Sequence, residues 1–108
     1  MKEIIIDEIV ELKKIFYDTE KLILNKQYDQ AYSVLQNIEA SDKTEKYYEL
    51  LGKVLIQKKQ LTQAVELIRA GQQQFLNSKI LFQILFEAFW GLKEYSEAVL
   101  ALAKVVRL

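Results

Sequence analysis

One ten-residue pattern occurs three times in this sequence and decides the fold. The segments are KQYDQAYSVL at residues 26–35, KQLTQAVELI at residues 59–68 and KEYSEAVLAL at residues 93–102. Their alanines, Ala31, Ala64 and Ala98, stand 33 and 34 residues apart. An aliphatic side chain follows each alanine by four residues, which places the two on one face of a helix. A fixed period of this length predicts an array of helical hairpins, with alanine where two helices approach closely.

The rest of the chain is helical in pattern as well. Apolar side chains recur at intervals of three and four residues, proline is absent and only three glycines occur. Candidate helix caps are polar or glycine residues near the expected boundaries, namely Asn25 for a left-handed turn, Ser41 or Asp42, Asn77 or Ser78, and Gly91. The sequence therefore predicts an all-α fold of six helices, at about residues 2–25, 28–40, 43–58, 61–75, 79–91 and 94–107.

The middle unit carries the fullest motif. Tyr48, Leu51, Gly52 and Leu55 form YELLGKVL, and Ala64 follows with Ile68 four residues later. This resembles the tetratricopeptide repeat, in which W-x2-L-G-x2-Y precedes A-x3-F in a period of about 34. Glycine inside a helix costs about 1 kcal/mol relative to alanine. Gly52 therefore predicts that another backbone approaches, near Ala64.

The other two units match less fully. The third has Phe86 at the small-residue position, the first is the weakest, and no unit has the family's late proline. The resemblance covers residues 12–108 and implies one domain over residues 1–108, built as a right-handed solenoid. Its three stacked hairpins would span about residues 12–44, 45–78 and 79–108, with a helical extension at 2–11.

The resemblance also implies a concave groove lined by the first helix of each hairpin, where a partner segment binds. The groove positions mix apolar anchors with both signs of charge: Lys13, Phe16, Glu20, Ile23, Lys46, Glu49, Lys53, Ile56, Ile80, Gln83, Glu87 and Trp90. Such a set suits an amphipathic helix or an extended segment with apolar side chains. Phe16, Ile23 and Trp90 could equally fill the core between helices.

The residues argue against three more specific functions, namely binding of acidic chaperone tails, metal binding and catalysis. Family members that grip the acidic tails of heat-shock chaperones use lysine and asparagine where this chain has Phe16 and Glu20. Lysine and arginine are likewise replaced by Ile80 and Ile84 in the third unit. Glu20, Glu49 and Glu87 could converge, but no local oxygen-rich pattern predicts a metal site. No nucleophile has a histidine beside it, so we expect no enzyme and no cofactor.

The composition of the chain argues against further kinds of partner, binding site and location. Fifteen Lys and Arg balance fifteen Asp and Glu without a basic stripe, so nucleic acid is not expected as a partner. Cysteine and histidine are both absent, which removes disulfides, thiolate metal sites and the commonest general base. Acidic residues interrupt the first apolar run, and no apolar run is long enough to span a bilayer. We expect a cytoplasmic protein without membrane insertion.

The last predicted helix is apolar nearly all the way round. Only Lys104 and Arg107 interrupt it between residues 98 and 108. One side must pack on the preceding helix, and the other exposes a candidate terminal interface of Val99, Ala103, Val106 and Leu108. A second protein, a second copy of the chain, or a further helix in a longer chain could cover this surface.

These observations predict a non-catalytic protein-binding module. It would bind an apolar or amphipathic segment of a partner protein, forming a heterodimer or a homodimer. Small bacterial type III secretion chaperones are similar in length, apolar groove and expected location, and they shield apolar subunits before export. The alternative is a homo-oligomeric structural or scaffold subunit that associates through its terminal helix.

Overall fold

The computed structural model describes the backbone of residues 2–107 and the side chains of residues 7–107. Within these residues the chain forms α-helices and one short 3-10 helix, without a strand, so the all-α prediction is confirmed. The elements are α1 (Lys2–Leu24), α2 (Tyr28–Gln36), η1 (Ala40–Asp42), α3 (Glu45–Gln57), α4 (Leu61–Gln72), α5 (Lys79–Gly91) and α6 (Tyr95–Arg107).

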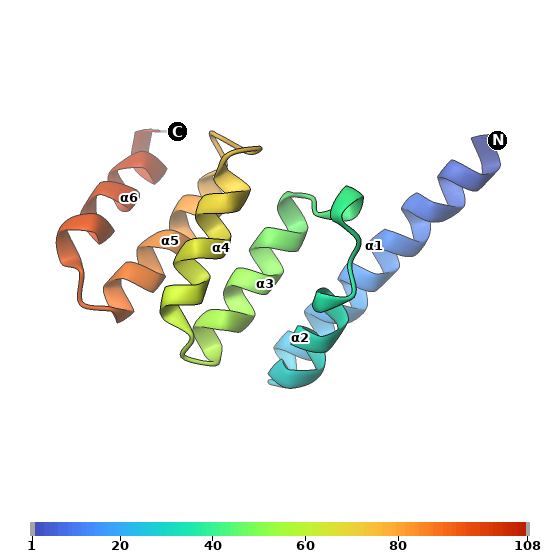
Figure 1. Cartoon of the computed structure of the whole chain (residues 1–108), viewed down its shortest axis with the longest axis horizontal. Helices are drawn as coiled ribbons and strands as arrows, with labels where there is room; N and C mark the ends of the chain where they lie inside the picture. The colour runs from blue at the N-terminus through green and yellow to red at the C-terminus, as the bar shows by residue number, and fades with distance from the viewer. Residues whose placement is uncertain (1, 108) are drawn as a thin grey trace.

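The helices pack in pairs and stand in a row along the molecule (Figure 1). α1 packs against α2, α3 against α4 and α5 against α6, which gives three helical hairpins. The first helix of each later hairpin makes the contact with the hairpin before it. Thus α3 touches both α1 and α2, and α5 touches both α3 and α4. The row measures 49 × 29 × 19 Å, with α1 at one end and α6 at the other (Figure 1).

The same turn closes all three hairpins. Lys26, Lys59 and Lys93 adopt left-handed conformations with φ of 61°, 64° and 63°. The residue after each lysine donates its backbone N–H to a carbonyl five positions earlier: Gln27 to Leu22 at 2.8 Å, Gln60 to Leu55 at 2.9 Å and Glu94 to Phe89 at 2.9 Å. These bonds define a Schellman motif, which satisfies carbonyls that a helix end leaves unpaired. The 33- and 34-residue period of the sequence is therefore a period of backbone conformation.

Two of the predicted caps are wrong because this motif places the left-handed residue elsewhere. Lys26 rather than Asn25 has positive φ. Gly91 is the last helical residue of α5, and the left-handed residue is Lys93 two positions later. A Cβ on Gly91 would lie 2.7 Å from Leu61 Cδ1, so this glycine makes room for the start of α4.

The link between α2 and α3 also differs from the prediction. α2 ends at Gln36, because Asn37 and Ile38 donate to carbonyls only three residues back and tighten the last turn. Ile38 then packs against the core, and Ser41 and Asp42 lie in the 3-10 helix rather than capping α3. The N-cap of α3 is Thr44, whose side chain makes no capping hydrogen bond. Ser78 does cap α5 as predicted, since its hydroxyl accepts from the Leu81 N–H at 3.3 Å.

Gly52 marks the place where three helices meet. A Cβ here would lie 2.8 Å from Ile68 Cδ1 of α4 and 3.0 Å from Ile84 Cγ2 of α5. The close neighbours are therefore side chains from two helices, and not the backbone near Ala64 that the sequence predicted. Ala64 itself is fully buried, as are Ala31 and Ala98 at the equivalent positions.

Candidate partner-binding site

α1 and the start of α3 enclose an apolar groove of about 520 Å³, which we call the α1–α3 groove. Its α1 side chains recur at intervals of one, three and four residues, so that they share one helical face. Thr44 and Lys46 complete it from the start of α3. Its lining residues are Ile9, Leu12, Lys13, Phe16, Tyr17, Glu20, Thr44 and Lys46.

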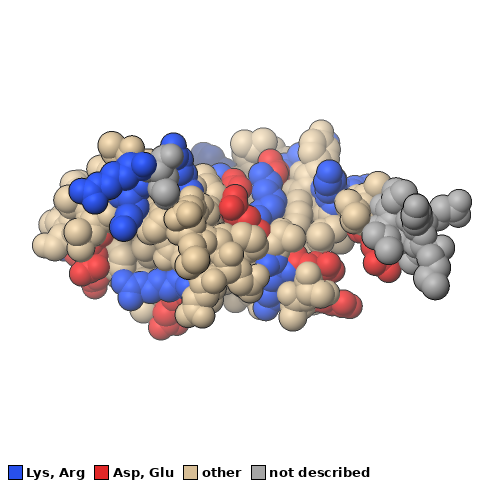
Figure 2. Space-filling model, turned by 90° about the horizontal axis from the view of Figure 1, so that it is seen from above, with Lys and Arg blue, Asp and Glu red and all other residues tan. Residues whose placement is uncertain are grey.

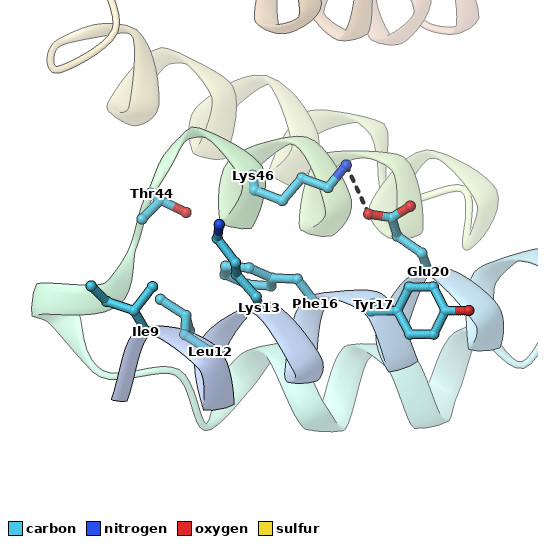
Figure 3. Close-up of a pocket in the computed structure, with 8 residues that line it drawn as sticks. All are labelled: Ile9, Leu12, Lys13, Phe16, Tyr17, Glu20, Thr44 and Lys46. Atoms are coloured by element: carbon cyan, nitrogen blue, oxygen red, sulfur yellow. Dashed lines mark ion pairs between the residues drawn. The ribbon is translucent and has the colours of Figure 1, made fainter. Parts of the chain in front are cut away.

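Figure 3 shows how these side chains lie. Lys13 and Phe16 extend from α1 toward α3, and Ile9 and Leu12 lie at the end of the groove nearest Thr44. The Lys46–Glu20 ion pair bridges the two helices at 2.8 Å (Figure 3). The groove thus has an apolar interior with charged groups at its edge, which is the usual composition of a binding pocket.

The ion pair at the edge belongs to a longer network. Lys46 also lies 3.6 Å from Glu49, and Glu49 lies 2.9 Å from Lys53. The hydrogen bond to Glu20 is the main cause that raises the pKa of the Lys46 ammonium above its usual value, and partial burial opposes it. Four predicted groove residues thus neutralise one another along α1 and α3, and a partner would have to compete with these pairs to use their charges.

Thr44 adds a polar group to the apolar lining. Its Oγ1 is buried and has no hydrogen-bond partner among the described residues. An unpaired buried hydroxyl costs roughly 1–3 kcal/mol. Among the described residues, no group of three acidic side chains is arranged to hold a metal ion, although Glu20 and Glu49 do meet at Lys46.

The structure divides the predicted groove residues into two groups. Lys13, Phe16, Glu20 and Lys46 line the α1–α3 groove together. Phe16 is only 7% exposed and belongs to the core, as one of its two interpretations predicted, while its side chain also lines the groove. The remaining members lie outside this groove. Ile23, Ile56 and Ile80 pack partly buried against the core, Glu49 and Lys53 belong to the ion-pair network, and Gln83 and Glu87 are exposed.

Trp90 stands apart from the other predicted anchors. Its ring centroid lies 4.9 Å from that of Tyr95 and 5.8 Å from that of Phe86, and the side chain is exposed. Tyr95 is the first residue of α6, so Trp90 joins the α5 end of the third hairpin to the surface of the terminal helix.

α6 presents an exposed apolar surface, as the sequence predicted. Val99 and Val106 are exposed and Ala103 is half-buried, whereas Leu108 lies outside the described residues. The structure adds Tyr95 and Leu102, which sequence reasoning used only to align the repeats. The four residues Tyr95, Val99, Leu102 and Val106 are spaced by four, three and four, and we call them the α6 stripe. That spacing was the signal that could have found them.

On the face of the molecule that Figure 2 shows, both signs of charge are present. Figure 2 shows basic and acidic side chains interspersed along the visible face, without a large area of one sign. In the part of the chain that the structure describes, no helix combines the length and the apolar character needed to cross a bilayer.

Comparison with protein-family models, curated proteins and solved structures finds no match to this chain. The likeness to tetratricopeptide repeats therefore depends on the residues and on the repeated turn geometry alone.

Proposed function

We propose that this chain is a tetratricopeptide-like module, a right-handed solenoid of three hairpins, that binds a partner protein without catalysis. The α1–α3 groove is the proposed binding site. The observation that carries the proposal is that four residues expected to face a partner line one apolar groove together with Ile9, Leu12 and Tyr17. An apolar groove with charged edges is suited to the apolar face of an amphipathic helix or to an extended segment with apolar side chains.

The arrangement supports an apolar anchor with a polar neighbour in the bound segment. The groove volume of about 520 Å³ accommodates one or two large side chains. Lys13 lines the groove, so a carboxylate or carbonyl beside the anchor could accept a hydrogen bond from its ammonium group. In its narrower form, the proposal is a cytoplasmic chaperone that keeps such a segment soluble, as type III secretion chaperones do.

A peptide selection tests the proposal. A phage-displayed library of amphipathic peptides should yield binders with apolar residues at helical spacing, and calorimetry should give micromolar affinities. Ile9→Lys places a charge at a half-exposed position of the groove and should weaken these peptides at least tenfold. Leu76→Lys makes the same kind of change at an exposed residue between α4 and α5 and should leave affinity unchanged. Failure to select binders, or equal binding by the Ile9→Lys variant, would contradict the proposal.

A further inference from the structure

A second groove lies beside α1, between this helix and the link from α2 to α3. α1 comprises 23 residues and α2 only 9, so the first turns of α1 extend past the end of α2 (Figure 1). Together with residues 37–42, which include η1, these turns line a groove of about 470 Å³, which we call the α1–η1 groove. The groove is therefore built from the part of α1 that its own hairpin leaves open.

The apolar lining of this groove continues from the core. Leu12 and Ile38 line it and pack, partly buried, against the core, and Ile9 and Ile15 line it as exposed side chains. Ile9 and Leu12 also line the α1–α3 groove, whereas Ile15 lines only the α1–η1 groove. Exposed apolar side chains in a hollow of this kind can cover the apolar side chains of a partner segment.

Every charged residue that lines the α1–η1 groove is acidic. Glu8 and Glu11 stand three residues apart on α1, which makes them neighbours on the helix surface, and Glu39 and Asp42 belong to the link. None of these four carboxylates takes part in an ion pair between described residues. The groove thus carries negative charge that no described ion pair neutralises.

The α1–α3 groove has a different charge. Its cations are Lys13 and Lys46, and its one carboxylate, Glu20, lies 2.8 Å from the Lys46 ammonium. α1 therefore presents a groove with basic groups on the side of α3 and a groove with acidic groups on the side of η1. Partners selected by charge would differ between the two.

We propose that the α1–η1 groove binds a basic amphipathic segment of a partner protein. Its apolar side chains cover Ile9, Leu12 and Ile15, and its lysine or arginine side chains pair with the carboxylates. This is a second binding site, and it does not depend on what the α1–α3 groove binds. Charge decides among the occupants, because an acidic segment would be repelled and an uncharged one would remove water from carboxylates without giving them partners, which is costly.

The four carboxylates are spread along the groove rather than gathered at one point. Among the described residues, no three acidic side chains are arranged to hold a metal ion. Carboxylates spread in this way suit cations that are spaced along a peptide. Lysine and arginine also suit the apolar lining, because their aliphatic stems pack on apolar surface while the charged end reaches a carboxylate.

Matched synthetic peptides test the inference. The first is a helical peptide with leucine at intervals of three and four residues and lysine at its polar positions, and two others carry glutamine or glutamate in place of lysine. Fluorescence anisotropy with the full chain should show micromolar binding of the lysine peptide, at least tenfold weaker binding of the glutamine peptide and no binding of the glutamate peptide. Absence of binding by the lysine peptide, or equal binding by the glutamine peptide, would overturn the inference.

Charge reversal tests whether the peptide binds in this groove. Glu8→Lys with Glu39→Lys changes one exposed carboxylate on each wall and should weaken the lysine peptide at least tenfold without lowering the melting temperature. Glu66→Lys with Glu97→Lys is the matched control, since it makes the same change in net charge at two exposed glutamates of α4 and α6, and it should retain binding. Equal losses in the two double variants would show that only the overall charge of the protein matters, and would contradict the proposed site.

Truncation of one residue from each groove separates the two sites. Ile15→Ala shortens a side chain that lines only the α1–η1 groove, and it should weaken the lysine peptide at least threefold. Tyr17→Ala shortens one that lines only the α1–α3 groove, and it should leave the affinity of this peptide unchanged. A loss with Tyr17→Ala, or an Ile15→Ala variant that binds as the wild type does, would place the peptide elsewhere and overturn the inference.

Discussion

The two ends of the row of helices differ in the residues that they place on a face that is buried inside the row. At the α1 end, the face equivalent to the buried sides of α3 and α5 carries Lys14 and Lys21, with Tyr17 exposed between them. At the α6 end, the face equivalent to the buried sides of α2 and α4 keeps its apolar residues, and Leu102 and Val106 are exposed. The α1 end is therefore adapted to solvent, whereas the α6 end retains the surface of an interior contact.

This difference indicates where the molecule is ready to associate. In a row of stacked hairpins each unit contacts only its neighbours, so the two ends need polar outer faces if the row is to remain a monomer. Tyr17 illustrates the solution at the α1 end. Its counterparts Leu50 and Ile84 are each 2% exposed, whereas Lys21 Nζ lies 4.5 Å from the centre of the Tyr17 ring and covers it with a charge.

Truncation at equivalent positions should show the largest contrast between the interior and the α6 end. Ile68→Ala removes a fully buried side chain that lies against Gly52 of α3, and it should lower the free energy of unfolding by about 2–5 kcal/mol. Leu102→Ala, at the same place in the third hairpin, should cost about 1 kcal/mol or less in dilute solution. Urea denaturation at low micromolar concentration measures both.

Leu35→Ala serves as the control for that comparison, because Leu35 is as fully buried as Ile68. Leu35→Ala should lower the free energy of unfolding by about as much as Ile68→Ala does. Equal losses for Leu102→Ala and Ile68→Ala would mean that the α6 face is covered in dilute solution, which would remove the distinction between the ends.

Replacing the two lysines should make the α1 end resemble the interior. Lys14→Leu with Lys21→Ala copies Leu81 and Ala88 of α5 and gives α1 a face that can receive the α6 stripe of another copy. Because this contact joins different surfaces, it does not close, and the mass should grow beyond a dimer as concentration rises. Light scattering measures the effect.

Val99→Glu, a change on the α6 stripe, can be added to the lysine variant as a control. The triple variant should lose the growth if α6 is the surface that meets α1. Growth that continues would show that the altered α1 face pairs with itself, and an unchanged mass in the double variant would show that the lysines do not limit association.

The smallest effect concerns Tyr47, the interior counterpart of Lys14. Burial raises the pKa of Tyr47 above its usual 10.0, so the folded state holds this proton more tightly than the unfolded state. The stability that this raised pKa contributes is complete below pH 10, and it is lost as the pH rises through the pKa of Tyr47 in the folded state. Lys46, whose pKa is raised above 10.5, contributes in the same direction. Melting temperatures should fall above pH 10, and less steeply in Tyr47→Phe than in the wild type. Identical alkaline profiles would show that Tyr47 is not protected from ionisation by the stack.

Much of the fold could be predicted from local pattern. The six helices follow from intervals of three and four residues, and most of their ends agree with the expected positions to within two residues. The errors at Asn25 and Gly91 arose because a Schellman motif tolerates lysine at its left-handed position, a preference that composition does not reveal. The end of α2 was misplaced because Ile38 turns in to pack on the core, which is a non-local contact.

The candidate site was also predictable only in part, because some of its contacts join residues that are far apart in the chain. Lys13, Phe16, Glu20 and Lys46 were assigned to one surface through their positions in the repeat, and they do line one groove. The pairing of Glu20 with Lys46, at 2.8 Å, joins residues 26 positions apart in the chain. The spacing of charges along a single helix cannot reveal such a pair.

By itself, the sequence determined which segments are helical and that one hairpin occurs three times, because both depend on side chains a few residues apart or on a fixed period. The tertiary structure decided which repeats of the pattern are covered. Ile68 and Leu102 occupy the same position of the repeat, yet one is fully buried and the other is 42% exposed. Burial depends on what packs against a helix from elsewhere in the chain. Ile68 Cδ1 lies against Gly52 of α3, which Ile84 of α5 also approaches, whereas no described residue buries Leu102.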